Sequence, residues 1–195
     1  KSMREEGISP NLASLTCILK ACGNTGAIEL GKQIHDEIVS RGLLEEEDTI
    51  LGTSLVDMYA RCGVLVKAQQ VLEELPIRDV ASWSALIAGH AREGQGHEVL
   101  KCLTRMQNEG VSPDEITFSS VIKACTHKGL TNEIQMLFQN MSQRYDITPS
   151  LEHHTAMVIG FGCAGHFEKA MEVIDAIPSS NHIELWLALM SACRK

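Results

Sequence analysis

The 195-residue sequence predicts an all-α fold, an α-solenoid built from stacked helical hairpins. Apolar residues recur with the spacing of a helix face, and no alternation typical of strands competes with it. Repeats of this kind stack so that each unit buries its apolar faces against its neighbours. The repeat is marked by Gly26, Gly63, Gly94, Gly129 and Gly165, which are spaced 37, 31, 35 and 36 residues apart.

The glycines set the boundaries of the units when each unit is taken to begin fourteen residues before its glycine. Residues 1–11 are then the end of a preceding repeat, and residues 183–195 are the first helix of a further, truncated unit. The five repeats between them are expected at 12–48, 49–79, 80–114, 115–150 and 151–182.

Each repeat is expected to contain two helices. The glycine suits a left-handed cap that ends the first helix, and a proline is expected to stop the second. Positions 4, 7, 8 and 11 carry the apolar stripe of the first helix, and positions 20, 23, 24 and 27 carry that of the second. Examples are Phe118, Val121, Ile122 and Cys125; Trp186, Leu189, Met190 and Cys193; and, for a second helix, Ala68, Val71, Leu72 and Leu75.

The composition excludes several classes of protein. Twenty-five acidic residues against 17 Lys and Arg give a formal net charge of −8, which excludes a uniformly basic nucleic-acid binder. No apolar run approaches the roughly 18 residues of a membrane span. Seven cysteines, an odd number, argue against a disulfide framework and for a reducing compartment. Because the sequence opens at Lys1 in mid-pattern, we expect a piece of a longer chain whose targeting peptide is out of sight.

Catalysis, metals and cofactors find little support in the sequence. His35, Asp36 and Glu37 match the His-x-Glu half of a zinc deaminase motif, but the Pro-Cys-x-x-Cys half is absent. Cys22 and Cys125, like the Cys193 of the last stripe, are separated by whole repeats and are expected in the core. We therefore expect no enzyme activity, metal or cofactor in this stretch, although a catalytic region could lie downstream or be recruited.

The repeats resemble pentatricopeptide repeats (PPR), specifically the plant PLS-type array. The stretch "ILKACGNTGAIELGKQIH" resembles an L repeat, and "LVDMYARCG" with "LPIRDVASWSALIAGHAREG" resembles the junction of S and P repeats. "GVSPDEITFSSVIKAC" resembles the entry to the terminal L repeat. "LEHHTAMVIGFGCAGHFEKAMEVIDAIP" resembles the terminal S repeat, with His154 where the family usually has tyrosine. "ELWLALMSACRK" resembles the start of an E-type motif.

The resemblance implies binding of single-stranded RNA, with one base read per repeat by residue 5 and the last residue. Thr or Ser paired with a final Asp favours guanine in the family, so the second and third repeats are expected to read two successive guanines. Residue 2 would pack against the base, which points to Ile50, Ala81 and Ile116. The implied pairs are Thr16 with Asp48, Thr53 with Asp79, Ser84 with Asp114, Ser119 with Ser150, and Thr155 with His182.

Two reservations follow from the residue types and charges. Ser, Thr and Asp are also common helix-capping residues, and Ser119 with Ser150 is no recognised combination. The five first helices sum to a formal charge of +1 and the rest of the chain to −9, which predicts a weak phosphate contribution and a shallow salt dependence. Arg61 and Arg92, both at position 13, are candidates for phosphate contact, with solvated surface arginine as the alternative.

The resemblance further implies a specificity factor for organellar C-to-U RNA editing, located in the mitochondrion or the chloroplast. Its partners would be an organellar transcript and, with it, editing-complex proteins or a deaminase. A protein–protein interaction scaffold and an RNA processing or stability factor remain the alternatives. Base-dependent RNA affinity separates a reader of RNA from a scaffold that binds protein alone.

Overall fold

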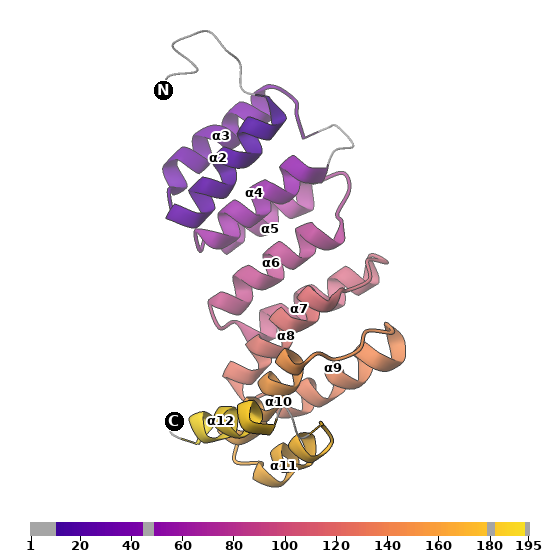
Figure 1. The fold of residues 1–195 in the computed structure, drawn as a ribbon. Helices are drawn as coiled ribbons and strands as arrows, with labels where there is room; N and C mark the ends of the chain where they lie inside the picture. Colours follow the sequence, from indigo (N-terminus) through magenta and orange to yellow (C-terminus); the bar gives the residue numbers. More distant parts are fainter. Residues whose placement is uncertain (1–10, 45–48, 179–181, 194–195) are drawn as a thin grey trace. The chain divides into compact units, whose positions relative to one another are not determined.

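The computed structural model describes residues 11–44, 49–178 and 182–193, and these residues form helices joined by turns, with no strand among them. The chain divides into two compact units, residues 1–89 and 90–195, so that the division falls near the end of helix α6 (Val80–Arg92). Figure 1 shows the order of the helices along the chain. The expected all-α class is confirmed, and the two units are described separately below.

In the first unit, the first helices α2 and α4 each pack against their own second helix, and α2 also packs against α4, the first helix of the next repeat. Helix α2 contacts α3 and α4, and α4 contacts α5. Leu15, Leu19, Leu55 and Leu72 are fully buried between these helices. The helices of this unit that precede α6 are α2 (Leu12–Thr25), α3 (Ile28–Ser40), α4 (Thr49–Arg61) and α5 (Leu65–Glu74).

The second unit repeats the same packing. Helix α8 contacts α7, α9 and α10, and α10 in turn contacts α9, α11 and α12. Both units are therefore stacks of helical hairpins, as the predicted α-solenoid requires. The helices are α7 (Gly96–Asn108), α8 (Glu115–Lys128), α9 (Thr131–Arg144), α10 (Leu151–Cys163), α11 (Phe167–Asp175) and α12 (His182–Ala192).

The glycine at the end of each first helix has the left-handed conformation that the sequence predicts. The φ angles of all five repeat glycines are positive, from 64° at Gly94 to 77° at Gly165. The backbone N–H of Gly26 donates to the carbonyl of Cys22, and that of Gly129 donates to the carbonyl of Cys125. These bonds satisfy carbonyl groups that the helix end would otherwise leave unpaired.

The prolines do not all stop the second helices, so that expectation is partly wrong. Pro76 follows α5 closely, but α7 and α9 have ended before Pro113 and Pro149 are reached. The chain instead turns after these helices at Gly110 and Asp146, whose φ angles are 78° and 53°. Each of the two later prolines directly precedes the residue that caps the next first helix.

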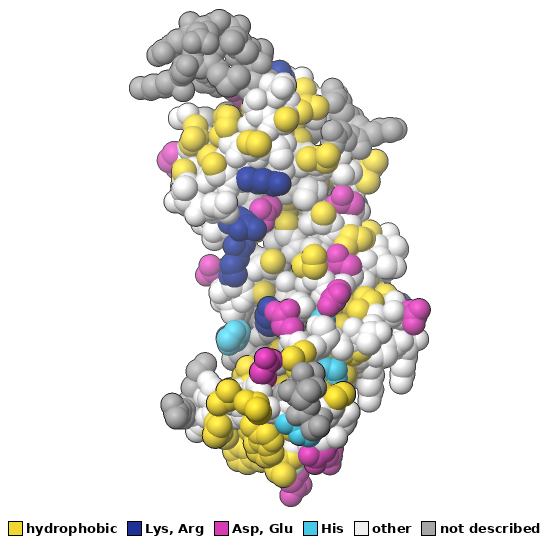
Figure 2. Space-filling view, viewed as in Figure 1, with side chains coloured by type: hydrophobic (Ala, Val, Ile, Leu, Met, Phe, Trp, Pro, Cys, Tyr) yellow, Lys and Arg dark blue, Asp and Glu magenta, His cyan; other side chains and the backbone are white. Residues whose placement is uncertain are grey.

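The apolar stripe predicted for the last helix is mostly exposed, which corrects the expectation of a buried stripe. On α12, Trp186 and Met190 are 41% and 53% exposed, and Cys193 after the helix is exposed. Figure 2 shows apolar side chains gathered over this helix. In the part of the chain that the structure describes, α12 packs on α10 and α11, and no later helix covers its other face. The buried positions are Leu185, Leu189 and Ala192.

Close approach of α6 to the preceding hairpin depends on a glycine. A Cβ atom added at Gly89 would lie 2.8 Å from Ala60 Cβ and 2.8 Å from Leu65 Cδ2. Real Cβ atoms do not approach other atoms so closely, so a larger residue forces the backbones apart. Interiors packed at this density tolerate added volume poorly.

We expect Gly89→Leu to lower the free energy of unfolding by about 1–3 kcal/mol, because added methylenes cannot be accommodated against Ala60 and Leu65. Urea unfolding followed by circular dichroism measures the change. Ala13→Leu, on the exposed side of α2, is the matched control and should change stability by less than about 0.5 kcal/mol. Equal stability of the two variants would contradict the close approach.

Candidate nucleic-acid interface

The fifth residue of each first helix lies one turn into the helix and is half-buried. This holds in both units, and the side chains concerned all carry a hydroxyl group. A hydroxyl can donate one hydrogen bond and accept two, so each position could meet a polar base edge. The residues are Thr16 on α2, Thr53 on α4, Ser84 on α6, Ser119 on α8 and Thr155 on α10.

Thr53 and Asp79 are brought together across the second repeat. The hydroxyl of Thr53 lies 3.4 Å from Oδ1 of Asp79, 26 residues later in the chain. Asp79 directly precedes α6, and its Oδ1 also accepts the backbone N–H of Ser82 at 2.8 Å. Burial alone would raise the pKa of Asp79, but hydrogen bonds from Ser82, Thr49 and Thr53 outweigh it and lower the pKa. At neutral pH the carboxylate is therefore a fixed acceptor.

The first and fifth repeats hold their predicted reading residues in local bonds. The hydroxyls of Thr16 and Thr155 donate to the carbonyls of Leu12 and Leu151, four residues earlier, at 2.9 and 2.8 Å. Nε2 of His182 bonds the carbonyl of Ile177 at 2.7 Å. Asp48, the predicted partner of Thr16, lies outside the described residues. Thr155 is thus bonded within α10, and His182 is bonded to the backbone of Ile177, which precedes α12.

Ser84 and Asp114, predicted as the pair of the third repeat, belong to different units, and each is described in its own. Ser84 is half-buried on α6. Asp114 caps α8, because its Oδ1 accepts the backbone N–H of Thr117 at 2.8 Å and the Thr117 hydroxyl at 2.6 Å. An ionised Asp at this position also suits the positive end of the helix dipole.

Ser119 and Ser150, the predicted pair of the fourth repeat, are joined through a residue that the sequence analysis missed. Nε2 of His153 lies 3.0 Å from the hydroxyl of Ser119, and Nδ1 lies 2.7 Å from the hydroxyl of Ser150. His153 is 1% exposed and stands third in α10, where it forms a capping box with Ser150. The Ser-x-x-His spacing of Ser150 and His153 is the sequence signal that could have indicated this capping box, although the usual capping box has Glu or Gln in place of His.

The predicted base-packing residues are solvent-exposed. Ile50 and Ile116 are 62% and 69% exposed, and Ala81 is exposed as well. Exposed isoleucines beside hydroxyl groups could pack against the face of a base. The fifth repeat differs, because Glu152 stands at the corresponding position and forms an ion pair with Lys123 of the preceding first helix.

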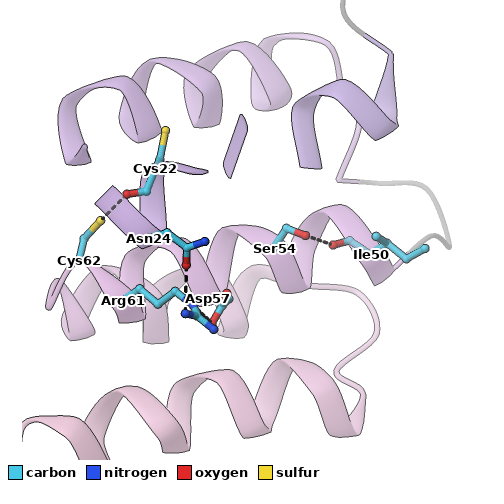
Figure 3. Close-up of polar contacts among 7 residues, drawn as sticks. All are labelled: Cys22, Asn24, Ile50, Ser54, Asp57, Arg61 and Cys62. Carbon is cyan, nitrogen blue, oxygen red and sulfur yellow. Dashed lines mark hydrogen bonds and ion pairs between the residues drawn. The ribbon is translucent and has the colours of Figure 1, made fainter. Parts of the chain in front are cut away.

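Arg61, a predicted phosphate contact, is held by neighbouring side chains (Figure 3). Its Nε lies 2.7 Å from a carboxylate oxygen of Asp57, one turn earlier on α4. Its Nη1 donates to the side-chain carbonyl of Asn24 on α2 at 3.2 Å. The guanidinium therefore bridges two successive first helices. Arg92, the other predicted contact, is exposed at the end of α6.

The second unit has a hollow over its first helices. Its volume is about 440 Å³, and its wall is mainly apolar with charged groups among its lining residues. A space of this size could hold a nucleotide base. The lining comprises Leu151, Glu152, Thr155, Ala156 and Ile159 of α10, Lys123, Thr126 and His127 of α8, and Glu184 of α12.

The residues of the half deaminase motif have structural contacts. Nδ1 of His35 lies 2.9 Å from the hydroxyl of Tyr59, and burial together with the charge of Lys67 lowers the pKa of His35. Among the described residues, no three His, Cys, Asp or Glu side chains come together as metal ligands would. Each helix in the described part of the chain is too short or too polar to cross a membrane.

Comparison with known sequences finds three descriptions of one family. A profile described as "PPR repeat family" matches residues 78–127, and one described as "Pentatricopeptide repeat domain" matches residues 1–25. A third, described as "PPR repeat", matches three stretches, residues 53–80, 116–145 and 152–182. A pentatricopeptide repeat-containing protein of Arabidopsis thaliana is 38% identical over 96% of the chain, and one from the same plant that is named mitochondrial is 37% identical over 100%. The chain spans 26% of the first of these proteins and 34% of the second.

Solved structures share the fold. The maize pentatricopeptide repeat protein PPR10 matches 95% of the chain with a TM-score of 0.73 and 22% identity, over 27% of its own length. The same protein in complex with an 18-nt psaJ RNA element gives a TM-score of 0.77 over 96% of the chain and 27% of its own. The PPR domain of Arabidopsis protein-only RNase P 1, in complex with tRNA, gives 0.65 at 11% identity, with coverage of 90% and 97%. These likenesses in sequence and fold agree: the chain belongs to the pentatricopeptide repeat family.

Proposed function

We propose that this chain is a sequence-specific, single-stranded RNA-binding module in which the first helices present base-reading side chains. The observation that carries the proposal is the approach of Thr53 to Asp79 across the second repeat, at 3.4 Å. Two fold relatives, PPR10 and the protein-only RNase P 1 domain, are bound to RNA in their solved complexes.

The polarity of this pair supports guanine as the base of the second repeat. An ionised Asp can only accept hydrogen bonds, and its lowered pKa keeps Asp79 ionised at neutral pH. Guanine offers two adjacent donors, N1–H and the 2-amino group, on its Watson–Crick edge. The exposed Ile50 lies three residues before Thr53 on α4 and could pack against the same base.

The biological setting is proposed from the resemblance to PLS-type arrays. An order of L, S, P, L and S repeats followed by an E-type start belongs to specificity factors of C-to-U editing in that family. We place the module in a mitochondrion or chloroplast, where it would position a transcript for a deaminase on the same or another chain. One relative named mitochondrial supports an organellar setting.

The two central repeats provide the main test. Thr53→Asn combined with Ser84→Asn should move the preference at two adjacent RNA positions from guanine to uracil, as the family's pairings imply. The expected change is about tenfold in relative affinity at each position, the size of one good hydrogen-bonded base contact. Fluorescence anisotropy with short RNAs that differ only at these two bases measures it.

The control for that test changes the same residue types on second helices. Thr104→Asn with Ser142→Asn lies on exposed parts of α7 and α9 and should leave the base preference unaltered. Equal affinity for every RNA, unaffected by the first pair of changes, would refute base reading. The exposed apolar face of α12 would then favour a protein-interaction scaffold instead.

The ion pairs of the first helices predict how phosphate contacts contribute. Arg61 is bound to Asp57, and Lys123 is bound to Glu152, so two cations of these helices are already partly neutralised. Figure 2 shows Lys and Arg side chains close to acidic ones on the helices of the first unit. We expect the affinity to fall only gently with salt, with few counterions released.

Asp57→Asn should release Arg61 for a phosphate group and tighten RNA binding severalfold. The plot of log affinity against log salt concentration should steepen by about 0.7, the value for one additional phosphate on a single strand. Anisotropy titrations at several salt concentrations measure both quantities. Glu98→Gln removes the same charge from the Lys101 pair on α7 and serves as the control. Identical behaviour of the two variants would exclude Arg61 from phosphate binding.

A further inference from the structure

His153 of the fifth repeat sits between the two predicted reading residues of the fourth repeat. Ser119 lies on α8, Ser150 is the N-cap of α10, and His153 is the third residue of α10. The imidazole contacts both, with Nε2 3.0 Å from the Ser119 hydroxyl and Nδ1 2.7 Å from the Ser150 hydroxyl. A change at His153 must therefore alter both serines.

The backbone N–H of Ser150 fixes the direction of these bonds. It lies 3.1 Å from Nδ1 of His153, and an N–H group can only donate. Nδ1 is therefore the acceptor, so the single proton of the neutral ring is on Nε2. Nε2–H then donates to the Ser119 hydroxyl oxygen, and the hydroxyl of Ser150 donates toward Nδ1.

The neutral form of the ring is favoured by its surroundings. His153 is almost fully buried, and this burial lowers its pKa; the nearby charge of His154 acts in the same direction. A hydrogen bond with the backbone of Glu115 and the negative charges of Glu115 and Glu152 act to raise the pKa, but they do not cancel the lowering by burial. Protonation would also place N–H groups of His153 and Ser150 against each other. The tautomer is thus set by geometry and stays the same at neutral pH.

This arrangement gives the two serines different roles. The Ser150 hydroxyl is engaged in the cap of α10, as the capping box shows. The oxygen of Ser119 accepts from Nε2–H, so its own hydrogen can be donated to another partner. Ser119 is half-buried and borders a narrow crevice shared with Lys123 and Glu152, on the side of the first helices. The fourth repeat can therefore offer one hydrogen-bond donor from Ser119.

We infer that His153 is a specificity-determining residue of the fourth repeat, acting from the fifth repeat by orienting the Ser119 hydroxyl as a donor toward the base. The inference rests on the proposed RNA-binding function. The Ser119 hydroxyl, as a donor, can pair with a keto oxygen of the base. An amino group of the base is itself a donor, so it cannot accept this hydrogen bond. The fourth repeat should accordingly favour uracil over cytosine, two bases that differ at position 4 in just this way.

Substitution of His153 can keep or reverse this polarity. In His153→Gln the amide oxygen can accept the Ser150 N–H, as Gln does in capping boxes, and the amide N–H can donate to Ser119. In His153→Glu the carboxylate can keep the cap, but it has no donor, so the Ser119 hydroxyl must donate toward it. Ser119 would then present only lone pairs to the base, which suits the amino group of cytosine.

The test measures the ratio of affinities for two RNAs that carry uracil or cytosine opposite the fourth repeat. That position is identified as the one whose base preference responds to Ser119→Ala. We expect a ratio of about three- to tenfold in favour of uracil, the value of one net hydrogen bond. It should persist in His153→Gln and reverse in His153→Glu. A loss of stability or a change in total charge lowers both affinities and leaves their ratio unaltered.

Two further measurements keep the inference falsifiable. If His153→Glu does not fold, His153→Leu removes both bonds and should bring the ratio toward one. The imidazole nitrogen shifts in ¹⁵N NMR should report a proton on Nε2 in the wild-type chain. A ratio that no change at His153 moves, while guanine reading by Thr53 and Asp79 persists, overturns this inference alone. Absence of RNA binding by the wild-type chain overturns it together with the proposed function.

Discussion

Burial between successive first helices is the constraint on which the rest of this structure depends. A single hairpin leaves apolar residues exposed on both sides, so α4 must pack against α2 as well as α5, and α10 against α8 and α12 as well as α11. Gly89 and Gly162 show how tight this packing is, since an added Cβ at either would lie 2.8 Å from a neighbouring side chain. Each stacked first helix carries its fifth residue half-buried, one turn from its start.

The helix termini connect this packing to the proposed chemistry. Each first helix needs its early N–H groups satisfied, and Asp79, Asp114 and Ser150 supply oxygen atoms directly before α6, α8 and α10. The same residues end the preceding repeats, where the resemblance places a base reader. A cap therefore fixes the reader in space, because its side chain is bonded before any RNA arrives.

Much of the fold could be predicted from the sequence because its signals are local. Helical spacing and the repeated glycines depend on residues within a single hairpin, and the positive φ of Gly26 and Gly129 follows from the same pattern. The exposure of Trp186 and Met190 could not be predicted this way, because burial depends on which helices lie alongside. Likewise, the bridge from Ser119 to His153 requires the offset between α8 and α10, which spacing along the chain does not give.

The double role of the residue before each first helix limits how such an array can acquire new preferences. Asp79 accepts an N–H of α6 with the same carboxylate that approaches Thr53. Any replacement must still cap a helix, and Ser, Thr, Asp and Asn are the side chains that do so well. Few side-chain types are therefore available at that position, and differences in base preference have to come from the partner residue one turn into the preceding first helix. Replacing the last residue of one repeat to change its base preference therefore also changes the stability of the next repeat.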